Sequence, residues 1–168
     1  MWTGILLALL VGYLIGGIPF GWLFAKLWKG VDLREVGSGN IGATNAYRVL
    51  GPIAGVVVFL LDTGKGVVPV ILSQHLGWNG IAGGIGAILG PSFSLYLRGR
   101  GGRAVATSLG VFLGLSPWAS LCAFGTWGAL LLATRYVSVA SVVGSLSLPL
   151  VWMWVFQTER AVHLIALL

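Results

Sequence analysis

Residues 36–48 form the first polar stretch of the chain, and they combine groups that bind an oxyanion. Glycines in this stretch let successive backbone N–H groups converge on an anion. Ser38 and Thr44 add hydroxyl donors, and Arg48 offers a guanidinium that can bind phosphate through two hydrogen bonds. The stretch therefore predicts a phosphate-binding loop. Its members are Gly37, Ser38, Gly39, Asn40, Gly42, Thr44, Asn45 and Arg48.

Two nucleotide-binding patterns are excluded by their context. The three glycines of this loop satisfy G-x-G-x-x-G, but that fingerprint requires a preceding strand and a βαβ unit. Here a charged segment precedes it. Gly64-Lys65 does not end a Walker A loop, because Phe59 stands at the first glycine position and Gly66 at the Ser/Thr position. Neither a dinucleotide site nor an NTPase is predicted.

Asp62 and Lys65 lie inside an otherwise apolar stretch, three residues apart, so they share one face of a helix. Ionisable groups within a membrane segment mark functional sites by default. A structural ion pair that neutralises itself is the alternative, and the two interpretations are compatible. Both residues are therefore candidates for the substrate site.

A third candidate is the basic stretch from Arg98 to Arg103, which precedes an apolar segment. It places guanidiniums and flexible backbone at the start of a helix, where the helix dipole also favours anions. A basic loop that only fixes topology is the alternative. The site residues predicted here are Gly101, Gly102, Arg103 and Thr107.

The composition is that of a chain embedded in lipid. Of 168 residues, 57% are hydrophobic and 8% charged, and the mean hydropathy is +0.96, whereas an ordinary globular domain is about 25% charged. The net charge of +6 does not indicate nucleic-acid binding, because the basic residues sit in short loops between apolar segments. We expect one transmembrane domain over residues 1–168.

The expected fold is all-α, with apolar segments separated by polar, Gly or Pro residues. The segments are 2–25, 51–74, 79–97, 104–115, 117–134, 137–157 and 161–168. A break at Ser116-Pro117 places almost all loop cations on one side, which the positive-inside rule assigns to the cytoplasm. The prediction is seven transmembrane segments, with the N-terminus outside and the C-terminus cytoplasmic. Residues 104–115 would reach only about 18 Å at 1.5 Å per residue, so neighbouring helices or thinned lipid must shield them.

Metal and disulfide chemistry are not indicated. Cys122 is the only cysteine, and neither His75 nor His163 has a carboxylate or thiol at ligand spacing. Neither histidine begins an H-x-x-x-x-D motif, since Gly80 and Leu168 stand at the fifth following positions. No metal or other cofactor is predicted.

Three sequence blocks resemble those of the bacterial acyl-phosphate:glycerol-3-phosphate acyltransferase family, in the same order and spacing. The blocks are 37–45 with 48–51, then 61–62 with 65–66, then 100–103 with 106–107. Residues 135–141 resemble a further family stretch, and the match covers essentially the whole chain. The resemblance implies a seven-helix enzyme of the bacterial inner membrane with its active site on the cytoplasmic side.

The resemblance also implies the reaction. An acyl group passes from acyl-phosphate to the 1-hydroxyl of glycerol 3-phosphate, giving lysophosphatidic acid and phosphate without coenzyme A, acyl carrier or metal. Ser38, Arg48 and Arg103 match the catalytic positions, and Ser138 and Ser141 are weaker candidates for the glycerol phosphate side. A substrate phosphate is favoured as proton acceptor over Asp62, because Lys65 lies beside that carboxylate. Oligomeric state and acyl-chain preference are not indicated.

The chain departs from the family pattern at three places. Arg103 replaces the usual Lys, Pro91 replaces a His, and a polar C-terminal tail with Asn, His and Arg does not follow Leu168. An Arg keeps the charge but presents a planar fork in place of a compact ammonium. Loss of the tail is expected to remove part of the acceptor site, and we interpret the sequence as truncated.

Two other classes of protein remain as alternatives. Glycine-rich half-helix ends and charges within the membrane also describe an anion transporter or channel. A membrane assembly subunit with a basic cytoplasmic face is the structural alternative. The polar blocks are dissimilar to one another and are all assigned to one side, whereas a transporter is expected to show internal repeats. One-sided sites favour an enzyme with a lipid product.

Overall fold

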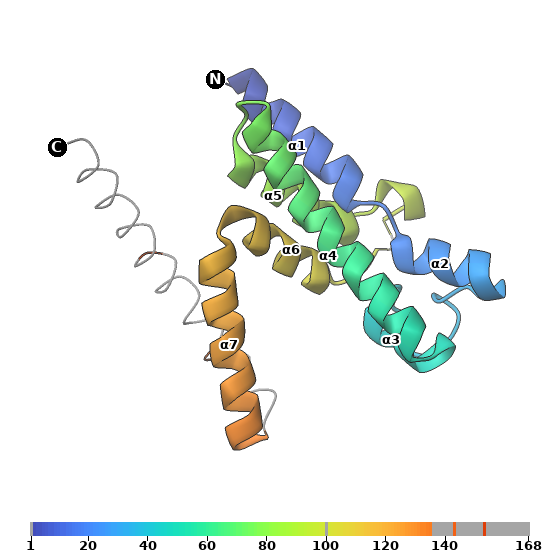
Figure 1. Ribbon diagram of the computed structural model, residues 1–168. Coiled ribbons are helices and arrows are strands. Elements are labelled where there is room, and N and C mark those ends of the chain that lie inside the picture. Colours follow the sequence, from blue (N-terminus) through green and yellow to red (C-terminus); the bar gives the residue numbers. More distant parts are fainter. Residues whose placement is uncertain (1, 100, 136–142, 144–152, 154–168) are drawn as a thin grey trace. The chain divides into compact units, whose positions relative to one another are not determined.

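A computed structural model describes residues 2–99, 101–135, 143 and 153 (Figure 1). The described elements are helices, and this part of the chain contains no strand. The chain divides into two compact units, Met1–Leu115 and Ser116–Leu168, which are described separately. The first unit contains α1 (Trp2–Gly16), α2 (Phe20–Lys29), α3 (Ala43–Leu50), α4 (Pro52–His75), α5 (Gly80–Ser92), the 3₁₀ turn η1 (Leu95–Leu97) and α6 (Val105–Leu115). The second contains α7 (Pro117–Thr134).

Three stretches of the described residues are long and apolar enough to cross a membrane. They are Trp2–Lys29, Pro52–His75 and Gly80–Leu97. With 24 residues, α4 is about 36 Å long at 1.5 Å per residue, which exceeds a hydrocarbon core of about 30 Å. The predicted break at Ser116-Pro117 is confirmed, because α6 ends at Leu115 and α7 begins at Pro117. Segments 137–157 and 161–168 lie outside the described residues, apart from 143 and 153, so the seven-segment topology stays a prediction.

The first expected segment, 2–25, is not one continuous helix. α1 ends at Gly16 and α2 begins at Phe20, because Pro19 has no N–H to continue the helical ladder. Side chains from other elements bind three carbonyl oxygens around this break. Tyr96 donates to Leu14 at 3.2 Å, Ser94 to Gly17 at 3.1 Å, and Lys65 to Ile18 at 2.9 Å.

Glycines let the helices of the first unit approach closely, as their small-xxx-small spacing predicts. A Cβ at Gly12 or Gly16 of α1 would overlap backbone carbonyl oxygens of α5. A Cβ at Gly110 of α6 would overlap the carbonyl oxygen of Thr63 in α4. α6 has only 11 residues, and this packing against α4 and α5 provides the shielding expected for such a short apolar helix.

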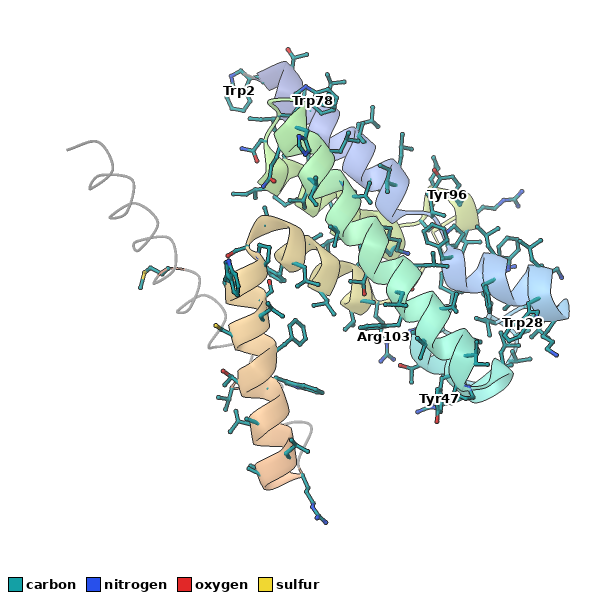
Figure 2. All side chains as sticks on the ribbon, in the orientation of Figure 1. Trp2, Trp28, Tyr47, Trp78, Tyr96 and Arg103 are labelled. Atoms are coloured by element: carbon teal, nitrogen blue, oxygen red, sulfur yellow. The ribbon has the colours of Figure 1, made fainter. Side chains whose placement is uncertain are left out.

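Many large apolar side chains are exposed, whereas most of the fully buried apolar positions are alanines. Alanines 8, 54 and 87 are fully buried, whereas Leu6, Leu10 and Leu60 are more than half exposed. Aromatic side chains lie beyond both ends of α4 (Figure 2): Trp78 follows its last turn, and Tyr47 precedes its first. Outward apolar faces flanked by aromatic residues are typical of helices in a bilayer.

A small apolar core fixes the segment that joins α2 to α3. It contains Leu33 from that segment, Ala25 from α2, Ala46 from α3 and Val58 from α4, all fully buried. Because Leu33 is anchored in this core, the residues that follow it emerge at a defined place. The polar stretch that begins at residue 36 therefore starts from a fixed point between three helices.

Candidate active site

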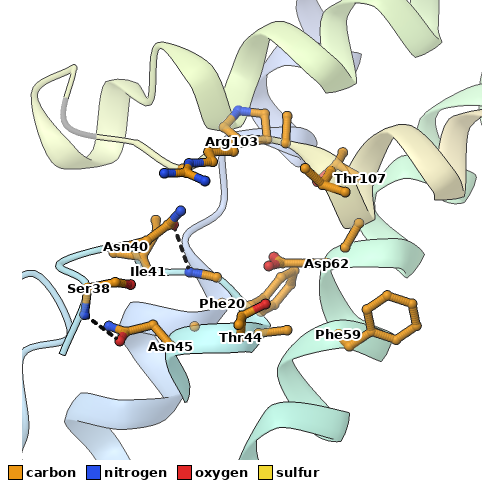
Figure 3. A pocket seen from close by; sticks show the side chains of 18 of the residues that line it. Phe20, Ser38, Asn40, Ile41, Thr44, Asn45, Phe59, Asp62, Arg103 and Thr107 are labelled. Carbon is orange, nitrogen blue, oxygen red and sulfur yellow. Dashed lines mark hydrogen bonds between the residues drawn. The ribbon is translucent and has the colours of Figure 1, made fainter. Parts of the chain in front are cut away.

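A cavity of about 420 Å³ lies within the first unit, where several parts of the chain meet (Figure 3). Its wall is formed by the loop before α3, the start of α3, the middle of α4 and the start of α6 with the residues just before it. The first residues of α2 and Pro91 near the end of α5 also contribute. The lining residues are Phe20, Gly21, Ser38, Asn40, Ile41, Gly42, Ala43, Thr44, Asn45, Arg48, Phe59, Asp62, Lys65, Pro91, Gly102, Arg103, Ala104, Val105, Ala106 and Thr107.

Two helices begin at this cavity. The first residues of α3, from Ala43, and of α6, from Val105, are part of its lining. Neither helix has an acidic residue in its first turn. The first N–H groups of a helix carry partial positive charge and bind anions readily. Two such ends at one cavity make it suited to a phosphate or a carboxylate.

Two guanidiniums add full positive charge. Arg48 and Arg103 both line the cavity, and within the described residues neither has an ion-pair partner. Figure 3 shows the guanidinium of Arg103 extending over the side of the cavity that carries Ser38 and Asn40. Because planar guanidiniums bind phosphate oxygens through two hydrogen bonds, this arrangement fits a phosphorylated substrate.

The loop before α3 is shaped by glycines and an amide. Gly37 and Gly39 adopt positive φ angles of 63° and 71°, a conformation that residues other than glycine rarely adopt. The side-chain oxygen of Asn40 accepts a hydrogen bond of 3.1 Å from the N–H of Gly42. The loop therefore turns tightly and directs Ser38 and Asn40 toward the cavity.

Asn45 holds this loop from inside. Its side-chain N–H₂ donates to the carbonyl oxygens of Leu33 at 3.1 Å and Val36 at 3.0 Å. Its side-chain oxygen accepts from the N–H of Ser38 at 2.9 Å. The residue is 1% exposed, so its amide is committed to the loop although it lies at the cavity wall.

Asp62 and Lys65 form the ion pair that the sequence offered as one alternative, and they also line the cavity. Lys65 Nζ lies 2.6 Å from Asp62 Oδ1, and the two side chains are 4% and 13% exposed respectively. Figure 3 shows the carboxylate of Asp62 facing the cavity. Because Lys65 is paired with Asp62, the positive charges open to a ligand are those of Arg48 and Arg103.

The basic loop before α6 rests on the end of α5. The N–H of Gly102 donates to the carbonyl oxygen of Pro91 at 2.8 Å, and a Cβ at Gly101 would overlap that same carbonyl. Arg98 ends η1 with a φ of 53° and does not line the cavity. The two ends of this loop therefore differ: Arg103 belongs to the cavity wall and Arg98 does not.

Most of the predicted site residues meet at the cavity. Gly37, Gly39 and Gly101 are not part of the lining, and they act by shaping or docking the backbone. Ser138 and Ser141 lie outside the described residues. The sequence interpretation missed Phe20 and Gly21 at the start of α2 and Phe59 on α4. Pro19 was the available signal for α2, because a proline within an apolar segment marks a probable helix break.

The fold and the cavity define a helical membrane protein with a cavity suited to an anion, and similarity to known proteins identifies its family. The family model described as glycerol-3-phosphate acyltransferase matches residues 6–168. The curated glycerol-3-phosphate acyltransferase of Desulforamulus reducens is 45% identical over 151 residues, which cover 88% of this chain and 75% of the relative. That of Geobacter sulfurreducens is 44% identical over 143 residues, covering 83% and 73%.

Two solved structures resemble the chain along most of its length. One is the crystal structure of PlsY (YgiH), an integral membrane glycerol 3-phosphate acyltransferase, in its glycerol 3-phosphate form. It has a TM-score of 0.76 and 40% identity, covering 92% of this chain and 77% of that one. The lysophosphatidic acid form has a TM-score of 0.75 and 39% identity. The chain belongs to the glycerol-3-phosphate acyltransferase family.

Proposed function

We propose that this acyltransferase moves a fatty acyl group from acyl-phosphate to the 1-hydroxyl of glycerol 3-phosphate, giving lysophosphatidic acid and phosphate. The observation that carries the proposal is a cavity with two helix N-termini and two guanidiniums that have no ion-pair partner among the described residues. Both substrates carry a phosphate group, so both would use such a site. The glycerol 3-phosphate and lysophosphatidic acid forms of the similar crystal structures support the acceptor and the product.

The reaction needs little covalent chemistry from the protein. The acceptor oxygen forms a bond to the acyl carbonyl carbon, the bond from that carbon to phosphate breaks, and the hydroxyl proton passes to the departing phosphate. Negative charge builds up on the carbonyl oxygen and on the phosphate, so positioned donors lower the barrier. Arg48, Arg103, the hydroxyl of Ser38 and the first N–H groups of α3 and α6 are the donors at hand.

The other lining residues have supporting roles in this proposal. Asn40, Thr44 and Thr107 offer polar groups for the phosphates or the glycerol hydroxyls. Asp62 remains paired with Lys65 and faces the cavity, where its carboxylate can accept a hydrogen bond from an acceptor hydroxyl. Asn45 positions the loop. Ser138 and Ser141 are proposed for the glycerol phosphate side on the family resemblance alone.

We also propose a location in the bacterial inner membrane with the cavity open to the cytoplasm. The loop cations of the polar blocks support this orientation through the positive-inside rule. Lysophosphatidic acid is a membrane lipid, so a cavity at the lipid boundary would release its product directly into the bilayer. The outward apolar side chains of α1 and α4 support contact with lipid.

Phosphate release by purified protein in lipid tests the donor. We expect release from acyl-phosphate that depends on glycerol 3-phosphate, with one lysophosphatidic acid formed for each phosphate. Acyl coenzyme A and acyl carrier protein serve as parallel donors. Equal turnover with acyl coenzyme A would contradict the proposed donor, and release that is independent of glycerol 3-phosphate would contradict the proposed acceptor.

A further inference from the structure

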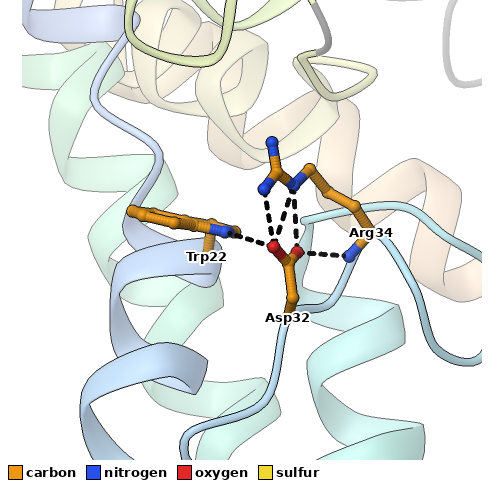
Figure 4. A network of polar contacts seen from close by, with 3 residues as sticks. All are labelled: Trp22, Asp32 and Arg34. Carbon is orange, nitrogen blue, oxygen red and sulfur yellow. Dashed lines mark hydrogen bonds and ion pairs between the residues drawn. The ribbon is translucent and has the colours of Figure 1, made fainter.

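A polar network on the loop between α2 and α3 lies outside the cavity lining and has no place in the reaction described above (Figure 4). It joins Asp32 and Arg34 of the loop to Trp22 of α2. Asp32 Oδ1 accepts from the backbone N–H of Arg34 at 3.0 Å and from its Nε at 2.9 Å. Asp32 Oδ2 accepts from Arg34 Nη2 at 2.6 Å and from the indole N–H of Trp22 at 3.1 Å.

The network lies at the surface, where the side chain of Arg34 is 35% exposed and that of Asp32 is 12% exposed. The guanidinium of Arg34 also lies over the Trp22 ring, with Cζ 5.6 Å from its centre. Hydrogen bonds from Arg34 hold the pKa of Asp32 well below its usual range, and those to Asp32 raise the pKa of Arg34. A carboxylate with a lowered pKa contributes stability above its unfolded value, about 3.9. That contribution is lost only as the pH falls through the lowered pKa of Asp32 in the folded protein. The pair of Asp32 and Arg34 therefore stays charged near neutral pH.

The network attaches the start of the loop to Trp22 of α2, and the end of the loop packs against the preceding residue of α2, Gly21. A Cβ at Gly21 would overlap the carbonyl oxygen of Ile41, which shows that Ile41 lies directly against the helix. Gly21 and Trp22 are neighbours in sequence, so both ends of the 32–41 loop rest on one turn of α2. Between these two ends, the side chain of Asn45 forms hydrogen bonds with backbone groups of residues 33, 36 and 38.

We propose that Trp22, Asp32 and Arg34 are positioning residues that hold the loop carrying Ser38 and Asn40 in its phosphate-binding geometry. Trp22 and Arg34 hold Asp32, which directly precedes Leu33. Leu33 is buried in the core, and its carbonyl oxygen accepts a hydrogen bond from Asn45. Asn45 in turn accepts a hydrogen bond from the N–H of Ser38 and so fixes its position. Arg34 is therefore a structural cation of the loop and not a ligand of the substrate, although it precedes Ser38 by only four residues. This inference rests on the proposed function, because the loop must contact substrate for its position to affect turnover.

Conservative substitutions separate positioning from simple stability. Trp22→Phe removes the indole N–H and part of the ring area, and keeps a smaller aromatic ring beneath Arg34. Asp32→Asn removes the charge, and Arg34→Lys keeps the charge but loses the planar fork. Glu35→Gln is the matched control. It removes a charge from the same loop; among the described residues the Glu35 side chain makes no hydrogen bond to the network, and its charge interaction with Arg34 is weaker than that of Asp32.

Two measurements are needed on protein in lipid well below its unfolding temperature. We expect kcat to fall about tenfold or more in Asp32→Asn, since misplacement by about 1 Å can reduce rates by about 100-fold. Amide hydrogen exchange over residues 33–42 should increase, while exchange over α5 stays unchanged. Trp22→Phe should show a smaller effect of the same kind, Arg34→Lys should recover part of the activity lost in Arg34→Gln, and Glu35→Gln should match the wild type.

The two measurements also separate this inference from the proposed reaction. Faster exchange in the loop with normal kcat would overturn the positioning role, as would unchanged exchange over 33–42. Should the Asp32 variant fail to fold, the milder Trp22→Phe decides by the same two readouts. A wild-type protein without turnover of acyl-phosphate would contradict the proposed donor, and the exchange measurement, which needs no substrate, would still decide whether the network holds the loop.

Discussion

The ammonium of Lys65 donates a hydrogen bond of 2.9 Å to the carbonyl oxygen of Ile18, and so connects the middle of α4 to the break between α1 and α2. The same nitrogen lies 2.6 Å from Asp62 Oδ1. One buried cation therefore binds a carboxylate on its own helix and a carbonyl left open by the break. This arrangement keeps Phe20, whose ring centre is 5.9 Å from Lys65 Nζ, at the cavity wall.

Lys65→Met is expected to destabilise the protein strongly. It leaves the Asp62 carboxylate and the Ile18 carbonyl without their partner, and breaking a buried ion pair in soluble proteins costs about 3–5 kcal/mol. The measurement is the thermal unfolding midpoint in lipid or a fixed detergent. The double variant Asp62→Asn with Lys65→Met should unfold at a higher temperature than Lys65→Met alone, because no charge is left unpaired. An unchanged midpoint in Lys65→Met would contradict a structural role for the pair.

The sequence predicts the helical membrane class and the main site residues because both depend on local features. Apolar length defines the segments, and the glycines, hydroxyls and arginines of 37–48 define an anion site before any packing is known. The spacing of Asp62 and Lys65 predicts their shared face, and the structure shows the pair. The break at Ser116-Pro117 follows from a proline that begins a helix.

Other features depend on contacts between distant residues and were not predictable in this way. The break at Pro19 lies within an apolar stretch, and its open carbonyls are bound by Ser94, Tyr96 and Lys65 from far along the chain. The role of Asn45 requires knowledge of where the carbonyl oxygen of Leu33 lies. Composition placed this asparagine in the anion loop, but only the fold shows that its amide is committed to holding that loop.

Ser38→Ala and Arg48→Ala should each lower turnover about tenfold or more, because a lost oxyanion donor typically reduces rates by about 10²–10³. Phosphate release from acyl-phosphate with saturating glycerol 3-phosphate measures this. Ser92→Ala is the matched control, since the Ser92 hydroxyl donates to the carbonyl of Ile88 in its own helix and does not line the cavity. Near-normal activity of both site variants would reduce the loop to a structural turn.

Asn45→Asp should loosen the loop and reduce turnover about tenfold or more, by the misplacement argument that applies to catalytic groups. The new oxygen would face the carbonyl oxygens of Leu33 and Val36, which lose their donor, and each buried unpaired group costs about 1–3 kcal/mol. Hydrogen exchange over residues 33–42 and kcat are measured together, with the wild type as reference. Lost activity with unchanged exchange would instead identify Asn45 as a direct ligand.

Cysteines placed at positions 40, 100 and 135 should react with an impermeant thiol reagent only from the cytoplasmic side, because the loop cations fix those loops there. The experiment needs a Cys122→Ser background, since the natural thiol is exposed. Labelling in intact cells is compared with labelling in inverted membranes. Reaction from the periplasmic side at any of the three positions would overturn the seven-segment topology.

Arg103→Ala should nearly abolish acyl transfer, whereas Arg98→Ala should leave it largely intact. Arg103 lines the cavity next to the start of α6, where the helix N-terminus adds positive potential. Arg98 ends η1 and is not part of the lining. Both substitutions remove the same charge from the same loop, and Arg98→Ala keeps the Cβ at the position with φ of 53°, so the pair is a matched comparison.

The two substitutions also distinguish a substrate ligand from a charge that only fixes topology. A topogenic cluster would respond to both changes alike, through insertion and not through turnover. Activity is therefore divided by the amount of correctly inserted protein, and inhibition by inorganic phosphate is measured in each variant. Arg103→Ala should also weaken phosphate inhibition, because a phosphate-binding guanidinium is lost. Equal losses of normalised activity in the two variants would contradict the assignment of Arg103 as a ligand of substrate phosphate.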